Sequence, residues 1–389
     1  MDRRVFIKLG AAAAVWPALI TPSAWTAEST AADKLDVHVD PRIELYETVL
    51  NLGPFRGLKN EDGVVEARVA TPFDFAYKRE VEKRFSPFKD HPAVKIYGEM
   101  ATQGLFRFGH PPSVMLHLSD PPGLEEKIPI DDFLVKMAGD RGKLTEFIEA
   151  MRGFARDSDF MAFFRGHRDF YRRLAEGYRK NMEWNYIGDL EEYYGAQQDG
   201  YHLILATLSH PGGFGPRIKT SDGRYEAYAV IGPKSVKDDN PEFGSGDSMR
   251  RLCWHEFSHS FVNVMTDAHL EDLKEPLGLL ESRKLPAPVV ERIKAAGMWD
   301  VHLCDQAGEY VVRGVTTRLA FKKLGTERGT AALNDEIKEG FTHLEAICKR
   351  LEVYESHRDK YPALKDFYPE IIAAFRDLAQ RPAPSSSGR

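Results

Sequence analysis

The residues with the clearest capacity for chemistry are two histidines and a glutamate that stand within five positions of one another. His255, Glu256 and His259 form the pattern H-E-x-x-H in a stretch that predicts a helix. Residues four apart lie one above the other on an α-helix, so both imidazoles can reach one metal ion while Glu256 contacts its water. Such a metal lowers the pKa of that water to about 7, and the glutamate takes the proton and passes it to a leaving amine. The pattern therefore predicts a zinc hydrolase with Glu256 as the general base.

The residues around this motif matter because a bare H-E-x-x-H arises by chance in roughly one chain in a hundred of this length. The flanking residues are apolar and predict a buried helix; they are Leu252, Trp254, Phe257, Phe261 and Val262. Burying two imidazoles and a carboxylate without partners is costly, and a bound metal ion would explain them. The alternative is a pair of hydrogen-bonded core histidines, with Glu256 in an ordinary ion pair.

A third protein ligand has to come from outside the motif, because Val262 and Met265 stand where a metzincin has glycine and histidine. We select Glu309, which opens a strongly helical run, because a second helix packed on the first could present it to the metal. His302 and His269 are the rival ligands. The full set of downstream candidates is Asp267, His269, Glu271, Glu275, Glu281, His302, Asp305 and Glu309.

Two further polar residues lie one helical turn beyond the selected ligands. Arg313 follows Glu309 at i+4, where it could orient that carboxylate or bind a substrate carboxylate or the developing oxyanion. An ordinary salt bridge is the alternative. Asn263 follows His259 at i+4 and could hydrogen-bond that ligand, although polarity near a helix end explains it equally well. Four residues compete for the role of stabilising the oxyanion: Tyr310, His302, Tyr225 and Arg313.

Several stretches of the chain together carry a family resemblance. They are HEFSHSFVN at 255–263, the E-x-x-x-R of Glu309 and Arg313 some fifty residues on, DPRIEL at 40–45, FSPFKDHPAV at 85–94, YESHRDKYP at 354–362 and DFYP at 366–369. This set resembles a large uncharacterised bacterial family that is similar to the gluzincin zinc peptidases. The resemblance implies that His255, His259 and Glu309 bind one zinc ion per chain and that Glu256 is the general base. It implies no particular substrate.

The elements that must position these residues fall into two lobes. Residues 33–195 show mostly helical spacing of apolar residues and predict a helical N-terminal lobe. Residues 196–380 predict a metallohydrolase-like lobe, gluzincin-like by the resemblance, that carries the motif on a helix from about residue 248 to 264. A Pro/Ser-rich, disordered tail is expected at 381–389. The predicted fold class is mainly α with a small β-sheet, in the α+β class.

Two short apolar stretches before the motif, Tyr201–Leu208 and Tyr225–Ile231, predict strands of a hairpin or small sheet. A glycine-rich segment around residues 211–215 lies between them. Gluzincins often have an edge strand here that pairs with an extended substrate, so the first stretch or this segment is expected to form one wall of the cleft. The alternative is a flexible turn with glycines at positive φ.

The N-terminus predicts an export signal. Arg3 and Arg4 precede a hydrophobic residue, a lysine and an alanine-rich apolar stretch, which together resemble a twin-arginine signal. Residues 1–31 are the expected leader, because the apolar run is shorter than the ~20 residues that span a bilayer. An uncleaved membrane anchor is the alternative. We therefore expect a periplasmic or extracellular protein without stable membrane insertion after cleavage.

Net charge and cysteine content indicate which partners and which disulfide bonds to expect. The net charge of -6 and the pI near 6.1 give no basic footprint for phosphates, so we expect no nucleic-acid partner. The three cysteines, Cys253, Cys304 and Cys348, are odd in number and cannot form a disulfide framework. We expect them to be core thiols, although one pair could bridge.

Three functions follow from these residues. The favoured one is a peptidase that acts on extended peptides or proteins of the cell envelope. The second is a zinc amidase or hydrolase of a non-peptide envelope substrate, because the same activation of water serves any amide. The third is a non-catalytic, metal-containing binding protein. Structural zinc usually has four protein ligands that include cysteine, so a set of two histidines and one glutamate favours an open, catalytic position.

Overall fold

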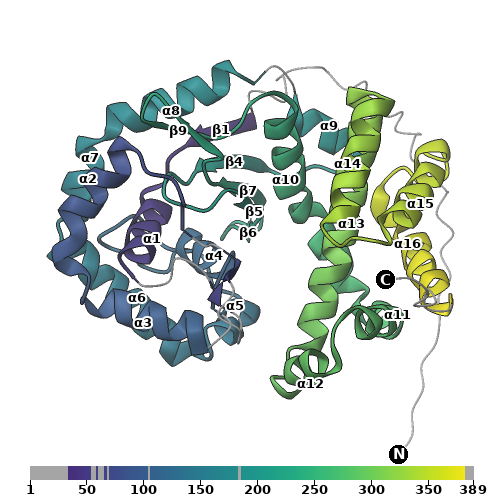
Figure 1. Ribbon diagram of the computed structural model, residues 1–389, viewed down its shortest axis with the longest axis horizontal. Coiled ribbons are helices and arrows are strands. Elements are labelled where there is room, and N and C mark those ends of the chain that lie inside the picture. Colours follow the sequence, from purple (N-terminus) through teal and green to yellow (C-terminus); the bar gives the residue numbers. More distant parts are fainter. Residues whose placement is uncertain are drawn as a thin grey trace, which may run out of the picture.

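The computed structural model describes residues 34–53, 58–59, 65–67, 70–103, 106–182 and 185–381. The predicted leader, residues 1–31, and residues 382–389 of the predicted tail lie outside the described residues. Helices dominate and enclose one small mixed sheet, so the predicted α+β fold class, mainly α, is confirmed (Figure 1). Among the helices of the described ranges, none is long and apolar enough to cross a bilayer.

A five-stranded sheet lies at the centre of the molecule (Figure 1). Strands β1, β4 and β7 run parallel, in that order, and β5 and β6 both pair antiparallel with the far side of β7. The bounds are Leu35–His38 for β1, Gly200–Leu205 for β4, Gly213–Phe214 for β5, Arg217–Lys219 for β6 and Tyr225–Ile231 for β7. Two separate strand pairs are β2 (Leu58–Lys59) with β3 (Val65–Ala67), and β8 (Ser235–Lys237) with β9 (Asn240–Glu242).

The two stretches predicted to be strands of a hairpin or small sheet, Tyr201–Leu208 and Tyr225–Ile231, correspond to β4 and β7. They belong to one small sheet, as predicted, but they are parallel neighbours and do not form a hairpin. The hairpin lies between β6 and β7, where Thr220 and Arg224 close a tight turn over Asp222 and Gly223. Gly223 has φ of +87°, a conformation that glycine adopts without steric cost. The chain after β4 therefore returns along the sheet edge as β5 and β6 before it enters the centre as β7.

Most of the helices before the motif form an arc on one side of the sheet, whereas α9 lies beside α10 (Figure 1). They are α1 (Pro41–Leu52), α2 (Ala76–Phe85), the 3₁₀ helix η2 (Ser86–Phe88), α3 (Pro92–Gln103), α4 (His110–Leu116), α5 (Asp132–Met137), α6 (Arg141–Asp157), α7 (Phe160–Gly166), α8 (Arg168–Lys180) and α9 (Tyr186–Tyr194). Only the short strands β1, β2 and β3 accompany these helices within the described residues, so this part of the chain is mostly helical.

The helices from the motif onward form the other side of the molecule, with α10 between the sheet and α13 (Figure 1). The bounds are Gly246–Ala268 for α10, Leu270–Lys284 for α11, Ala287–Ala295 for α12, Trp299–Leu324 for α13, Thr326–Lys338 for α14, Leu344–Ser356 for α15 and Leu364–Gln380 for α16. Helix α13 contacts α10, α11, α14 and α15, so it is the central element of this side. At Gly314 of α13 an added Cβ would lie 2.9 Å from Ile347 of α15, which shows how closely these helices approach.

Helix α1 is buried along most of its length, including two carboxylates. Asp40 caps its start by accepting hydrogen bonds from the backbone N–H groups of Arg42 and Ile43. Within the helix, Glu44 Oε1 accepts from the hydroxyl groups of Tyr77 at 2.8 Å and Thr207 at 2.6 Å. Burial raises the pKa of the Glu44 carboxyl to about 7. The neighbouring carboxyl of Glu47 is also fully buried, and burial raises its pKa well above the usual value.

Replacing Glu44 with glutamine should flatten the dependence of stability on pH. The folded-state pKa lies above the usual value of 4.5, so the contribution of the protonated carboxyl is fully present below pH 4.5 and is lost as pH rises through about 7. The free energy of unfolding of the wild type should therefore fall by about 3 kcal/mol more than that of Glu44→Gln over this window. Urea unfolding at pH 4.5 and 7.5 measures this, with the exposed Glu146→Gln of α6 as the control. Parallel pH profiles for the wild type and Glu44→Gln would contradict the expectation.

Candidate metal centre

The orientation of α10 is fixed by aromatic contacts on the sides that face away from its histidines. Phe257 meets Tyr201 of β4 edge to face at 5.6 Å, and Phe261 stacks on Tyr194 of α9 at 4.4 Å. Cys253 lies 3.0 Å from the hydroxyl of Tyr178, so its thiol points into the core. With those faces buried, His255 and His259 project from the remaining side toward a cleft.

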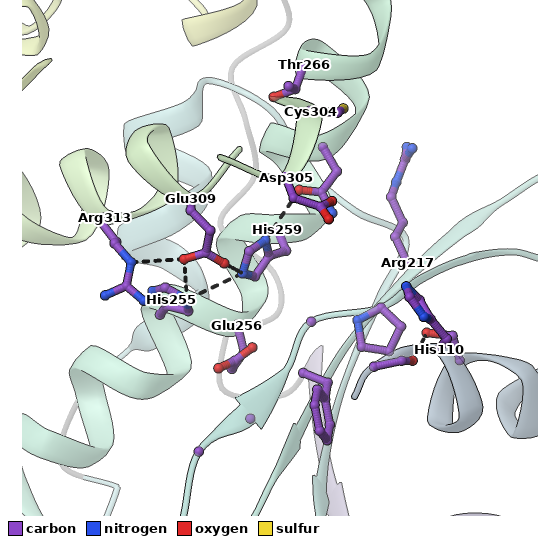
Figure 2. Close-up of a pocket in the computed structure, with 18 of the residues that line it drawn as sticks. His110, Arg217, His255, Glu256, His259, Thr266, Cys304, Asp305, Glu309 and Arg313 are labelled. Carbon is purple, nitrogen blue, oxygen red and sulfur yellow. Dashed lines mark hydrogen bonds and ion pairs between the residues drawn. The ribbon is translucent and has the colours of Figure 1, made fainter. Parts of the chain in front are cut away.

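The two histidines and Glu309 meet at one point between α10 and α13 (Figure 2). The Nε2 atoms of His255 and His259 are 3.4 Å apart. Glu309 Oε1 lies 3.4 Å from His259 Nε2, and Glu309 Oε2 lies 3.8 Å from His255 Nε2. The general-base candidate Glu256 stands beside them, since one ligand atom of each of the three motif residues lies within 4.8 Å of the others.

These residues fit the requirements of a zinc ion. Ligand atoms of a tetrahedral zinc with bonds of about 2.1 Å stand about 3.4 Å apart, which is close to the separations around His255, His259 and Glu309. Two imidazole nitrogens and a carboxylate oxygen are a donor set that leaves a coordination position open. The sequence-predicted ligands are thus the residues that the fold brings together.

The two polar residues predicted one turn beyond the ligands both contact them. The Arg313 guanidinium donates to Glu309 Oε2 at 2.9 Å and also bonds to Glu336 of α14. His259 Nδ1 lies 3.3 Å from Asn263 Oδ1, so the amide oxygen can accept the ring N–H and direct Nε2 toward the centre. Both residues thus contact a predicted ligand, which agrees with an orienting role and, for Arg313, also with the ordinary salt bridge that was the alternative.

The rival ligands lie elsewhere. His302 Nε2 is 3.1 Å from Glu281 Oε2, and His269 stacks on Tyr368 at 5.4 Å; neither lines the cleft. Of the remaining carboxylates, Asp267 and Asp305 line the cleft. Burial, followed by the charge of Glu309, raises the pKa of Asp305 to about 6. Glu271, Glu275 and Glu281 do not line it.

Burial governs the protonation of the motif side chains. It lowers the pKa of His255 to about 3, so the imidazole is neutral near pH 7, the form in which it binds metals. Burial, and then the charge of Glu309, raises the pKa of Glu256 to about 8. Burial also acts to raise the pKa of Glu309, but the charges of His255, His259 and Arg313 outweigh it and hold the pKa below its usual value.

Comparison with known proteins provides a family but no activity. A family model described as a domain of unknown function (DUF4932) matches residues 35–374, from the first strand of the sheet to the last helix. The chain belongs to the DUF4932 family. No curated protein and no solved structure matches this chain. The family description gives no activity, so the resemblance of this DUF4932 protein to gluzincins remains a prediction.

The centre opens onto a cleft of about 1680 Å³. On one wall are α13 and α14, with Glu309, Arg313 and Glu336; on the other is the segment of β5 and β6, backed by α4 and α5. Ligand pockets for small molecules usually measure about 300–1,000 Å³. The cleft of this DUF4932 protein is therefore large enough for an extended polymer segment.

The glycines of β5 allow the sheet edge to approach the motif. A Cβ at Gly213 would lie 2.6 Å from Glu256 Oε1, and one at Gly215 would lie 2.1 Å from the backbone oxygen of Glu256. Gly212, Gly213 and Gly215 are not among the described glycines with positive φ, so the alternative of a turn with left-handed glycines is wrong. As expected, this segment forms one wall of the cleft, and its glycines are required by close packing.

Several cleft residues had not been singled out from the sequence. His110 of α4 and Arg217 of β6 lie across the cleft from the two histidines (Figure 2), and Lys234 also lines it. Of the four residues that competed for the oxyanion role, Arg313 lines the cleft, whereas Tyr310, His302 and Tyr225 do not. His110 and Arg217 are far from the motif in sequence, and only the paired strands and the neighbouring helix bring them to the cleft.

Replacing Gly215 with alanine should destabilise the protein by about 1–3 kcal/mol, the usual range for overpacking. The added methyl group would overlap the backbone of α10, which cannot move as a flexible side chain can. A matched control is Gly177→Ala within α8, where the new Cβ meets nothing within 4 Å. That substitution should stabilise the protein by about 0.5–1 kcal/mol. Urea unfolding measures both, and equal effects of the two substitutions would contradict the close approach of β5.

Proposed function

We propose that this protein is a zinc-dependent, gluzincin-like peptidase that cleaves extended peptides. The observation that carries the proposal is the convergence of Glu309 from α13 on His255 and His259 of α10. An ordinary pair of core histidines would have no need of a carboxylate from a second helix that is itself held by an arginine.

The ligands would be His255, His259 and Glu309, and Glu256 would be the general base. A bound zinc ion would polarise the scissile carbonyl and make water a stronger acid. Glu256 lies beside the ligands, where the positive charge of a bound zinc ion would offset the burial that raises its pKa. Its carboxylate would then take a proton from the attacking water and return it to the leaving amine. Arg313 holds Glu309 through one carboxylate oxygen, and Asn263 orients His259 through its other ring nitrogen.

The sheet edge supports a peptide as the substrate. Strand β5 pairs with β7 on one side and lies at the edge of the described sheet, where Gly213 and Phe214 line the cleft. An unpaired strand edge offers backbone donors and acceptors to an extended chain. A polymer of amino acids can use such an edge, whereas a compact amide would gain little from it.

The predicted leader supports a site of action in the cell envelope. The paired arginines and short apolar stretch in residues 1–31 resemble a twin-arginine leader, and the family match begins after it, at Leu35. We propose that the mature protein acts in the periplasm or outside the cell.

Metal content and peptide cleavage together test the proposal. Mass spectrometry of the mature protein should show one zinc per chain fewer in His259→Ala and in Glu309→Ala than in the wild type. Glu256→Gln should keep its zinc and lose about 10²–10⁴-fold in the rate of cleaving a mixed peptide library. Glu339→Gln, an exposed carboxylate of the same cleft, is the control and should retain activity.

Two results would count against parts of this proposal. Full zinc content in Glu309→Ala would move the third ligand to another residue. Zinc binding by a wild type that cleaves no peptide would replace the peptidase with a hydrolase of non-peptide amides or a metal-containing binding protein.

Substitution of Arg313 tests how the third ligand is held. Arg313→Met removes the hydrogen bond to Glu309 while keeping a long side chain, and should weaken zinc binding about 10–100-fold. Competition with a chelator measures the affinity. Arg251→Met is a matched control, because Arg251 pairs with Asp335 and Glu336 of the same wall. Equal affinities for the two variants would show that Arg313 acts on something other than the ligand.

A further inference from the structure

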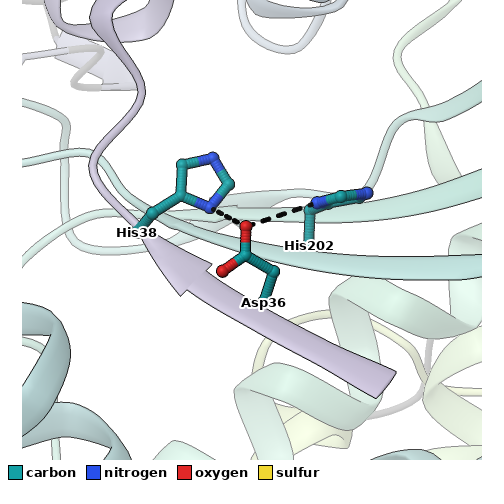
Figure 3. Close-up of side chains that lie close together, drawn as sticks. All are labelled: Asp36, His38 and His202. Atoms are coloured by element: carbon teal, nitrogen blue, oxygen red, sulfur yellow. Dashed lines mark ion pairs between the residues drawn. The ribbon is translucent and has the colours of Figure 1, made fainter. Parts of the chain in front are cut away.

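A second group of side chains that could hold a metal ion, Asp36, His38 and His202, comes from strands β1 and β4 (Figure 3). Asp36 and His202 are direct neighbours across the parallel strands β1 and β4. His38 follows Asp36 by two residues and therefore shares its face of the sheet. The alternate residues, such as Tyr201, face α10. None of the three lines the cleft.

The ring nitrogens of both histidines converge on a single carboxylate oxygen. His38 Nδ1 lies 3.0 Å from Asp36 Oδ2, and His202 Nδ1 lies 3.9 Å from the same atom. At this distance His38 Nδ1 and Asp36 Oδ2 form an ion pair when the ring is protonated, although the approach does not have the geometry of a hydrogen bond. A nitrogen and an oxygen at this separation are also placed as two ligands of one ion are, because the ligand atoms of a tetrahedral zinc ion stand about 3.4 Å apart.

Both imidazoles also have a carboxylate on their other nitrogen. His202 Nε2 lies 3.4 Å from Glu226 Oε2, and the hydroxyl of Tyr228 donates to that same oxygen at 3.1 Å. The ring of Tyr228 stacks on His202 at 4.7 Å and fixes its plane. On the other side, His38 Nε2 lies 3.7 Å from Asp40 Oδ2. Metal-binding histidines commonly have a carboxylate or carbonyl at the ring nitrogen that does not bind the metal, because it fixes the tautomer and the ring orientation.

The remaining contacts of Asp36 are compatible with this role. Arg179 donates to Asp36 Oδ1 at 3.1 Å, which leaves Oδ2 directed at the histidines. The side chains of Asp36, His38 and His202 are 55%, 31% and 25% exposed, so an ion can reach them from solvent. Two imidazoles and one carboxylate suit zinc and similar first-row ions better than calcium or magnesium, which prefer sets of oxygen ligands.

We propose that His38 Nδ1, His202 Nδ1 and Asp36 Oδ2 form a second transition-metal site that fastens β1 to β4. The site is separate from the cleft and does not depend on the proposed peptidase activity. Three protein ligands leave at least one position for water. Glu226 is a positioning residue that holds His202, and Asp40 does the same for His38.

Zinc titration of metal-free protein tests the proposal. His259→Ala, which removes one histidine of the cleft, is the parent, so that the second site is counted by itself. Calorimetry with Zn²⁺ should give one ion per chain, and Mg²⁺ should give no signal. Adding His202→Gln or Asp36→Asn should weaken this binding more than about 100-fold, and Glu226→Gln about 10–100-fold. Zinc should raise the melting temperature of the parent but not that of the His202→Gln variant.

Controls separate this result from misfolding and from the cleft. His91→Gln removes a histidine whose Nε2 pairs with Asp157 at 3.3 Å, and should leave zinc binding unchanged. Melting temperatures measured in the presence of a chelator show whether each variant is folded. If His202→Gln does not fold, Asp36→Asn, at an exposed position, is the variant that tests the site. If the cleft bound no zinc, His259→Ala would equal the wild type and the loss on His202→Gln would still support the second site. A parent that binds no zinc, or a folded Asp36→Asn variant that binds it as tightly, would overturn the proposal.

Discussion

The close contact between α10 and α13 is the constraint on which the candidate centre depends. Two histidines come from one helix and the carboxylate from the other, so a small shift between the helices would separate them. Helix α13 is held by helices on several sides, and Gly314 lets α15 approach it closely. On its other sides, α10 packs against the sheet through Phe257 and against α9 through Phe261. The geometry of three side chains is therefore maintained by the packing of most of the second half of the chain.

The same packing explains why polar groups can be buried at this point. Burial disfavours the charged forms of His255 and Glu256, whereas the pKa of Glu309 is held below its usual value and the Arg313 guanidinium contacts its carboxylate. Arg313 connects that carboxylate to Glu336 on α14, so the charge is shared between two helices. An uncompensated carboxylate at this depth would be costly. The guanidinium of Arg313 supplies the compensation, and the proposed zinc ion would add to it.

The local part of the candidate centre could be predicted from the sequence, whereas its long-range part could not. Histidines at i and i+4 share a helix face wherever the helix lies, and the i+4 spacing of Glu309 and Arg313 is equally local. The order of the strands depends on contacts between distant parts of the chain and could not be predicted in this way. The D-G pair at Asp222 and Gly223 is a hairpin signal at the true turn. The longer glycine-rich segment at 211–215 carries more turn residues and therefore predicts a hairpin at the wrong position. Its glycines serve a contact with α10, and spacing along a chain does not reveal such contacts. The contact of Asp36 with His202 likewise could not be predicted from the sequence, because it depends on the register of β1 with β4.

The position of β1 in the sheet has a consequence for how the chain folds. Leu35 pairs with Tyr201, and β4 in turn requires β7, which ends at Ile231. Strand β1 must therefore wait for partners that are synthesised much later, and closing so long a loop is slow relative to forming local helices. Helices α1–α9 can form early, but the sheet and the α10 surface that it covers assemble only after more than half of the chain has been made. A nascent chain that stops before Ile231 would thus leave the apolar residues of β1 and β4 without their partner strand β7, which makes the completion of this small sheet the step at which aggregation and productive folding compete.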